Sequence, residues 1–475
     1  MKISIPFPSA AGALRHSLFV PRSPRGGSNA PLRLGCRLFV VGCSMFAITA
    51  LADTATNRLK LTSAVLGSYS DELRTNSPAI KAAQARKTSA ESRLAGVRSW
   101  ANPDVSLGIY LASRPKREDD GDLVYGVSQS LPLWGRVAAE RSAAESSILV
   151  ASAGVDLQFQ QLRLELVRQF LRTALADRTA AIMADDLRWL DALVDLARQR
   201  AATGAGATAE ILRLQNEQDV QSTRLATEKE RAGEARSQLN RLLGRPASTA
   251  WPQFELPDLG PELRFNDRFR QLTLRNEAKL KLLNRTAEAT ATGIEVAKRA
   301  ARPDVRVFGE LRQYSGSGEA REGMLGVAMS VPWFNRGRYR ADVARAEAEA
   351  DAARLDAADY ERFVPVEARR IATLAGNARR EAIAYRDRIL PRTTQMLEAM
   401  RGSWVSGSGD LISLFDIRRQ WLDGQRMLAN ATAEQWQMLA EITLCCGLAD
   451  LEAIEALNDP AIDAGSHIPD AGSKP

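Results

Sequence analysis

One segment of the chain opens with Ala101-Asn102-Pro103-Asp104-Val105 and closes with Gly126-Val127-Ser128-Gln129-Ser130-Leu131-Pro132-Leu133-Trp134-Gly135-Arg136. A second copy opens with Ala301-Arg302-Pro303-Asp304-Val305 and closes with Gly326-Val327-Ala328-Met329-Ser330-Val331-Pro332-Trp333-Phe334-Asn335-Arg336. Both landmarks recur at one constant offset, from Pro103 to Pro303 and from Arg136 to Arg336. The chain therefore contains an internal duplication.

Each copy has the alternation of a β-hairpin, which we predict over residues 103–131 and 303–331. Apolar side chains alternate with small or polar ones, as in Val105-Ser106-Leu107-Gly108-Ile109. One apolar and one polar face are typical of a strand in a membrane barrel with a wet interior. A soluble hairpin packed on helices has the same pattern, so the surrounding sequence must decide between the two.

The first 52 residues have the composition of a secretory signal peptide. They contain six basic residues and no acidic ones, then a short apolar core and Ala50-Leu51-Ala52. We expect cleavage before Asp53, although Val40-Val41-Gly42-Cys43 also has some likeness to a lipoprotein cleavage site. Removing those six from the 64 basic residues leaves 58 against 57 acidic ones, so the charge indicates no nucleic-acid partner.

Long amphipathic helices follow each hairpin, and we expect the fold to be mainly α with a small membrane β-part. The expected domains are a signal peptide at 1–52, a first repeat at 53–244, a Pro-rich linker at 245–262, a second repeat at 263–447, and an equatorial segment with a disordered tail at 448–475. Each repeat has a helix, the hairpin, a long helix (135–202 or 337–402) and a return helix (209–243 or 410–446). Pro365 and Pro391 are predicted to bend the second long helix, which also contains about three extra residues.

The two hairpins together supply four strands, which cannot close a barrel alone. A four-stranded sheet has two open edges, and unpaired edges cannot face lipid. Three copies of the chain would close a twelve-stranded barrel. Antiparallel helices of this length form a coiled-coil wall, so the same three chains would also enclose an α-helical barrel.

In these features the mature chain resembles the TolC family of outer-membrane efflux proteins. The resemblance is carried by the duplication, by Ser-x-Pro at the strand ends before a Gly-Arg or Asn-Arg helix start, and by Ile389-Leu390-Pro391. Trp404-x-x-Gly407 leading into Leu414-Phe415-Asp416, and the ending Leu242-Leu243-Gly244, add to it. The run from Ser128 to Arg136 is similar to members that serve heavy-metal efflux pumps.

The resemblance implies a homotrimeric channel-tunnel in the outer membrane of a Gram-negative bacterium. It implies a barrel in outer-membrane lipid, a helical tunnel in the periplasm, a periplasmic adaptor protein and an inner-membrane pump of the RND type. It also implies a periplasmic entrance ringed by two acidic residues one helical turn apart. Here those positions are Ser413 and Asp416, and Glu210 takes the place of Ser413 in the first repeat.

We therefore expect Asp416, with Glu210 and Ser413, to line a periplasmic gate. Asp416 could instead pair with Arg418, Arg419 or a neighbouring helix and act only as a latch. The helical turns are predicted to be the docking tips for the adaptor and pump, and they contain Thr203, Gly204, Gly206, Trp404, Ser406, Gly407 and Gly409. Trp134, Trp333 and Phe334 fit a membrane-interface belt, or core packing at the strand–helix junction.

No catalytic, metal or cofactor site is expected, and no enzyme, because the only histidine after the signal peptide is His467 in the tail. Two other classes remain as alternatives to the channel. A periplasmic coiled-coil adaptor would need β-rich segments that the sequence lacks. A coiled-coil scaffold of an envelope complex would explain the helices but not two hairpins with a lipid-facing pattern.

Overall fold

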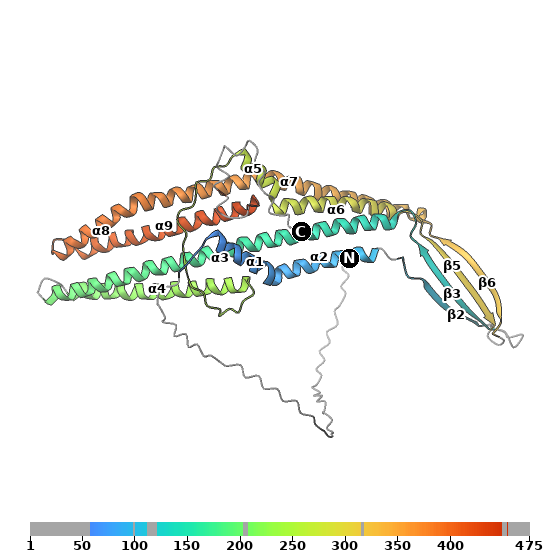
Figure 1. Cartoon of the computed structure of the whole chain (residues 1–475), viewed down its shortest axis with the longest axis horizontal. Helices are drawn as coiled ribbons and strands as arrows, with labels where there is room; N and C mark the ends of the chain where they lie inside the picture. Colours follow the sequence, from blue (N-terminus) through green and yellow to red (C-terminus); the bar gives the residue numbers. More distant parts are fainter. Residues whose placement is uncertain are drawn as a thin grey trace, which may run out of the picture. The chain divides into compact units, whose positions relative to one another are not determined.

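The computed structural model describes residues 58–97, 100–111, 121–202, 208–314 and 318–448, together with Ile454. All of them belong to one compact unit, Ala55–Pro475, and its helices and strands are labelled in Figure 1. The expected signal peptide at 1–52 and the C-terminal tail beyond Ile454 lie outside the described residues.

Four strands form one antiparallel sheet in the order β2-β3-β5-β6. They are β2 (Asp104–Leu111), β3 (Gly121–Leu131), β5 (Val305–Tyr314) and β6 (Ala320–Met329). Both predicted hairpins are confirmed, and β3 and β5 join them into a single sheet, with Ser128 opposite Phe308. Among the described strands, β2 and β6 pair on one side only, so each leaves an open edge.

The register puts most apolar side chains of the four strands on one face, while Val124, Phe308 and Met324 lie on the other. Val105 lies opposite Val127, Tyr125 opposite Leu311, and Val307 opposite Val327. The other face carries small and charged residues, including Ser106, Ser128, Arg306, Glu310, Arg312 and Glu322. Alternation with period two therefore produces two chemically different faces, as the sequence predicts.

Helices make up most of the rest of the chain. The first repeat contains α1 (Ser63–Asn76), α2 (Pro78–Val97), α3 (Arg136–Ala202) and α4 (Thr208–Leu242). The second contains α5 (Asp267–Asn276), α6 (Ala278–Ala300), α7 (Arg336–Ala384), α8 (Leu390–Val405) and α9 (Leu411–Cys445). At 1.5 Å per residue, the 67 residues of α3 span about 100 Å. The strands lie at one end of the helices, and the α8–α9 turn lies at the other (Figure 1).

The two prolines of the second long helix behave differently. α7 runs without interruption from Arg336 to Ala384 through Pro365, and the bend expected there stays a prediction. A π-helical turn at Tyr385–Ile389 precedes Pro391, and the Leu390 amide donates to the Tyr385 carbonyl. Together α7, the π-helical turn and α8 run from Arg336 to Val405 and contain 70 residues. This is three more than in α3, which confirms the expected insertion.

Both repeats end in the same way. Gly244 and Gly447 follow α4 and α9 with φ values of +69° and +64°, a conformation that favours glycine. The next amide reaches back to the helix, from Arg245 to the Asn240 carbonyl and from Leu448 to the Thr443 carbonyl, each at 2.8 Å. A short parallel pair of strands, β1 (Arg58–Lys60) and β4 (Gln253–Glu255), ties the linker to the start of the described chain.

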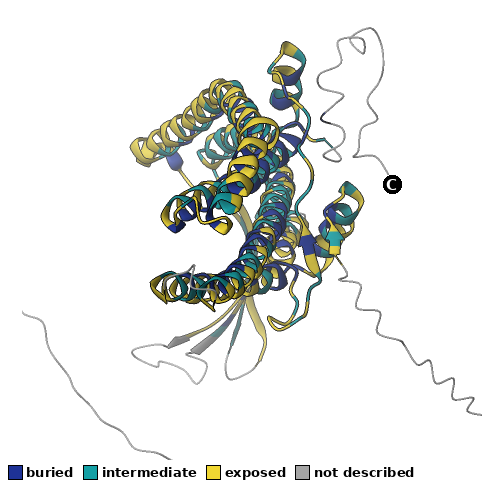
Figure 2. Cartoon of the chain, turned by 90° about the vertical axis from the view of Figure 1, so that its left-hand side faces the viewer, coloured by how far each residue is buried: buried dark blue, intermediate teal, exposed yellow. Residues whose placement is uncertain are grey.

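The core is distributed along the helices, because each helix buries only the side that meets its neighbours (Figure 2). One cluster, around Phe170, packs α1, α3 and the end of α4, and another, around Phe269 and Ile371, packs α5, α7 and α9. A third, around Leu190, Leu214 and Trp404, packs α3, α4, α8 and α9 near the helical turns. None of the described helices is long and apolar enough to cross a membrane.

Candidate functional site

The apolar face of the sheet is exposed. Leu325 is 91% exposed, Leu107 75% and Val105 70%. No described helix or strand covers this face, and Ile109, Val127, Val327 and Met329 extend it. A contiguous apolar face of this kind marks contact with lipid or with another protein.

The opposite face carries its charges in pairs. The Arg312 guanidinium lies 2.8 Å from the Glu322 carboxylate on the neighbouring strand, and Arg306 lies 3.8 Å from Asp104 across β3. The Phe308 ring lies over Gly326, where a Cβ atom would come within 2.5 Å of it. Paired charges beside small residues suit a surface that water wets.

The aromatic residues at the strand–helix junction are exposed in the chain. Trp134 and Trp333 are about half exposed, and Phe334 is 89% exposed, so core packing within the chain does not explain them. Trp134 has a φ of +61°, and its indole nitrogen donates to the Pro303 carbonyl at 2.9 Å. This bond joins the junction of the first repeat to that of the second.

The α8–α9 turn lies at the opposite end of the helices and contains Ser406, Gly407 and Gly409. Ser406 and Gly407 are exposed, and Gly407 has a φ of +79°. The amides of Ser408 and Gly409 both donate to the Ser403 carbonyl at 3.0 Å, which fixes the turn. Thr203, Gly204 and Gly206 of the other predicted tip lie outside the described residues.

Trp404 corrects one sequence-based expectation. Its side chain is fully buried, and the Arg200 guanidinium lies 4.7 Å from the ring centre. A residue in this position cannot contact a docking partner. Trp404 instead packs α8 against α3, because a cation over an aromatic face stabilises both groups.

The predicted gate residues have three different environments. Asp416 is exposed, and it makes no ion pair in the described part of the chain. The Glu210 carboxylate lies 3.9 Å from the Arg200 guanidinium. The Ser413 hydroxyl donates to the Asp410 carboxylate, and the Ser413 amide, which also donates to it at 2.8 Å, lowers the pKa of Asp410.

Asp416 lines a groove of about 230 Å³ that also contains arginines from two helices. Asp423 and exposed Arg213, Arg224, Arg419 and Arg426 share it. Positive charge therefore outweighs negative charge around Asp416, and the surface of this groove is not simply acidic.

Sequence reasoning did not find the ion pair beneath this groove. Arg418 bonds to Asp186 of α3 with its Nε at 2.7 Å, and its Nη1 donates to Glu217 of α4 at 3.0 Å. Burial alone would lower the pKa of Arg418, but the two carboxylates raise it. The spacing in the sequence could have indicated that Arg418 is buried. It follows the buried Leu414 by one helical turn, and so it lies on the side of α9 that faces the core.

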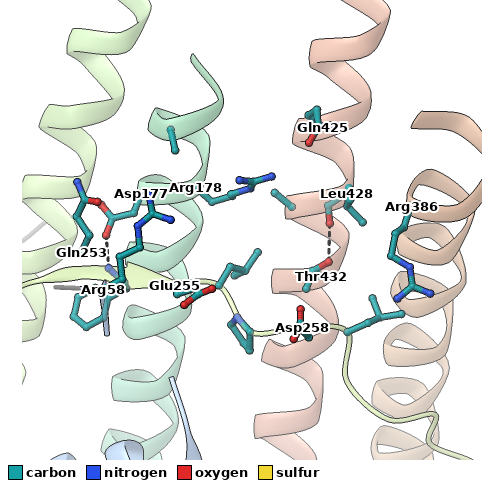
Figure 3. Close-up of a pocket in the computed structure, with 16 residues that line it drawn as sticks. Arg58, Asp177, Arg178, Gln253, Glu255, Asp258, Arg386, Gln425, Leu428 and Thr432 are labelled. Atoms are coloured by element: carbon teal, nitrogen blue, oxygen red, sulfur yellow. Dashed lines mark hydrogen bonds between the residues drawn. The ribbon is translucent and has the colours of Figure 1, made fainter. Parts of the chain in front are cut away.

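Another cavity, of about 310 Å³, lies where the linker crosses α3 and α9 (Figure 3). The Asp177 carboxylate accepts hydrogen bonds from Arg236 and from the Phe254 amide. The Gln435 amide oxygen accepts from the Gly260 amide at 3.0 Å, so the linker is bonded to both repeats. No cluster of three metal-ligating side chains occurs among the described residues.

Comparisons with known proteins agree with this arrangement. Residues 69–245 match the model of the outer membrane efflux protein family. No curated protein sequence matches the chain. The outer-membrane channel OprN superposes with a TM-score of 0.70 at 20% identity, covering 81% of this chain and 90% of its own.

Two further outer membrane proteins have the same fold. The outer membrane protein VceC from Vibrio cholerae gives a TM-score of 0.63 at 18% identity, covering 81% of this chain and 96% of its own. The CmeC outer membrane channel of Campylobacter jejuni gives 0.70 at 13% identity, covering 84% and 90%. At these identities the likeness establishes the fold, which extends over both repeats.

Proposed function

We infer that the chain belongs to the outer membrane efflux protein family and acts as the outer-membrane channel of an efflux system. The sheet is the observation that carries this inference. It has one exposed apolar face, one face of small and paired polar residues, and two open edges. A membrane strand needs the two different faces, since its outer face meets lipid and its inner face meets water, and the open edges indicate that the sheet pairs with further strands.

Closure of the barrel requires other copies of the chain. In hydrocarbon every backbone amide and carbonyl must be bonded, so the outer edges of β2 and β6 need partners. Three copies supply twelve strands, and β6 of each would pair with β2 of the next. The homotrimer would then have its barrel in the outer membrane and its helices in the periplasm.

The helical turns are the surface on which we propose that partners dock. The exposed Ser406–Gly409 turn would meet a periplasmic adaptor and an inner-membrane pump, which we expect to be of the RND type. Asp416, one helical turn or more inside α9, would face the passage with its neighbouring arginines. Glu210 and Ser413 would contribute less, because Arg200 and Asp410 engage them.

A periplasmic adaptor or a coiled-coil scaffold fits the molecule less well than a channel. Neither function uses a sheet with an exposed apolar face. In a water-soluble protein, another protein would have to cover the apolar side chains of all four strands. The chain would carry substrates through a tunnel and would catalyse no reaction on them.

Fractionation and conductance test this function together. The protein should separate with the outer membrane, resist extraction until detergent is added, and conduct ions after insertion into a planar bilayer. A protein recovered in the soluble periplasmic fraction, or one that never conducts, would contradict it. The apolar-face variant Leu325→Asp offers a matched check, because it should lose insertion while Met324→Asp on the water-facing side should keep it.

A further inference from the structure

A groove of about 670 Å³ lies at the junction of the sheet and the helices in the second repeat. It is lined by Trp134, Trp333, Tyr339 and three arginines, Arg302, Arg336 and Arg340. Met329 belongs to the apolar face of the sheet, and the groove begins three residues later at Pro332. The groove therefore starts close in the chain to the strand that carries the surface assigned to lipid.

The three arginine side chains make no hydrogen bond or ion pair within the described residues. The acidic residue among those lining the groove, Glu347, follows Arg340 by about two turns of α7 and is 4.0 Å from Lys298. Among the described residues, the three arginines therefore bring positive charge to the groove without a paired acid. An arginine fork suits a phosphate group, which it can bind through two parallel hydrogen bonds.

The duplication provides an internal comparison. In the first repeat the positions of Arg302 and Arg340 are held by Asn102 and Glu140. Arg136, the counterpart of Arg336, is 2.9 Å from both Glu140 and Asp304, so its charge is compensated. At the second junction Arg340 takes the place of Glu140, and neither Arg336 nor Arg340 has an ion-pair partner among the described residues.

We propose that this groove binds the headgroup of an anionic phospholipid in the periplasmic leaflet of the outer membrane. The phosphodiester would lie against Arg302, Arg336 and Arg340, and the acyl chains would run along the apolar face of the sheet. Trp134 and Trp333 suit the headgroup level, where amphipathic rings gather. Basic pockets of this kind recognise anionic lipid headgroups. The proposal rests on the proposed function, since it needs the sheet to be in the membrane.

Native mass spectrometry of the purified full-length protein, with phosphatidylglycerol or phosphatidylcholine added, tests the site. We expect up to one tightly held phosphatidylglycerol per chain and weaker adducts of phosphatidylcholine. Each Arg→Gln change should weaken phosphatidylglycerol binding about five-fold, the equivalent of about 1 kcal/mol per basic residue near a lipid surface. The triple variant R302Q/R336Q/R340Q should lose the selectivity for phosphatidylglycerol.

Arg362→Gln is the matched control, because Arg362 is an exposed arginine of α7 with no ion pair among the described residues and does not line the groove. It should bind phosphatidylglycerol like the unmodified protein. Equal binding of both lipids, or undiminished binding by the triple variant, would overturn the proposal. A triple variant that falls apart into single chains would also overturn it, because the groove would then be filled by a second copy. A protein that never inserts or assembles would instead refute the channel function itself.

Discussion

Arg418 of α9 and Asp186 of α3 form a buried ion pair, with side chains 4% and 2% exposed. The Arg418 Nε donates to one carboxylate oxygen at 2.7 Å, and its terminal nitrogen donates to the other. The pair joins the return helix of the second repeat to the long helix of the first. It lies near the helical turns, where Trp189 and Phe415 surround the guanidinium.

Breaking this pair should destabilise the helical end strongly. Arg418→Met leaves the Asp186 carboxylate buried without its partner, which typically costs about 3–5 kcal/mol of unfolding free energy. The double variant R418M/D186L should recover a large part of that loss. Thermal unfolding followed by circular dichroism measures both. Arg419→Met, at the exposed neighbouring position, should change stability by less than about 0.5 kcal/mol.

The two cysteines after the signal peptide should be unreactive in the folded protein. Burial raises the pKa of the Cys446 thiol to about 12, and it raises that of Cys445 as well. Maleimide should therefore label neither residue at pH 8 until the protein is denatured, and then label two thiols if the signal peptide has been removed. Rapid labelling of the native protein would contradict the packing around Thr273, whose hydroxyl lies 3.3 Å from the Cys446 sulfur.

The Cys446 thiol should also make the stability of the fold fall at alkaline pH. A thiol whose pKa is higher in the folded than in the unfolded chain stabilises the fold fully below its ordinary pKa of 9.0. That contribution is lost as the pH rises from there towards about 12. Cys446→Ala should reduce the alkaline loss of stability between these values, as measured by the unfolding midpoint.

The Asp416 carboxylate should favour the passage of cations through the channel, whereas the arginines beside it should favour anions. Asp416→Asn removes negative charge from a groove that keeps Arg213, Arg224, Arg419 and Arg426. The reversal potential in a planar bilayer under a salt gradient should move towards anion selectivity. Asp356→Asn, on an exposed part of α7 outside the groove, should leave it unchanged. A rise in conductance without a change in reversal potential would make Asp416 a latch.

The strand connections and the α8–α9 turn should be on opposite sides of the outer membrane. The expected external loops are residues 114–121 and 315–323, and Asp119→Cys in the first should react with an impermeant maleimide on whole cells. Asp119 lies outside the described residues. Ser408→Cys, in the exposed turn, should react only after the outer membrane is permeabilised. The reverse result would invert the proposed orientation.

The sequence predicts the elements of this fold well because its periods are unambiguous. Alternation with period two identifies β2, β3, β5 and β6, and Gly244 and Gly447 mark the ends of the return helices. The pairing of β3 with β5 could not be read in this way, because it joins segments that are far apart in the chain. Its register depends on how the two repeats pack together.

The candidate site was harder to predict than the fold, for reasons visible at three residues. Trp404 stands beside a glycine-containing turn and was expected to belong to the docking tip, but Arg200 from α3 covers its ring. Glu210 was expected at a gate, and the same Arg200 engages it. Arg418 is charged yet buried, because its partners come from α3 and α4. Each environment is created by a helix distant in sequence.

In the barrel of three copies that we propose, β6 of one copy pairs with β2 of the next. The duplication predicts the register of that seam, because β6 and β2 correspond to β3 and β5 after a shift of 200 residues. Ser128 lies opposite Phe308 within the chain, so Ala328 should lie opposite Gly108 of the next copy. Directly opposed strand residues have Cα atoms about 4.5–5.5 Å apart, which is within the range that a disulfide spans.

Oxidation of the double variant G108C/A328C in outer membranes tests the pairing of β6 with β2 of the next copy. Both positions are on the water-facing side of the sheet, and each chain would bond to two neighbours. We expect a covalent trimer on non-reducing gels, which collapses to single chains on reduction. The mismatched pair G108C/M329C, on opposite faces, should give none. Single chains only, or a ladder that continues beyond three, would contradict a closed barrel of three copies.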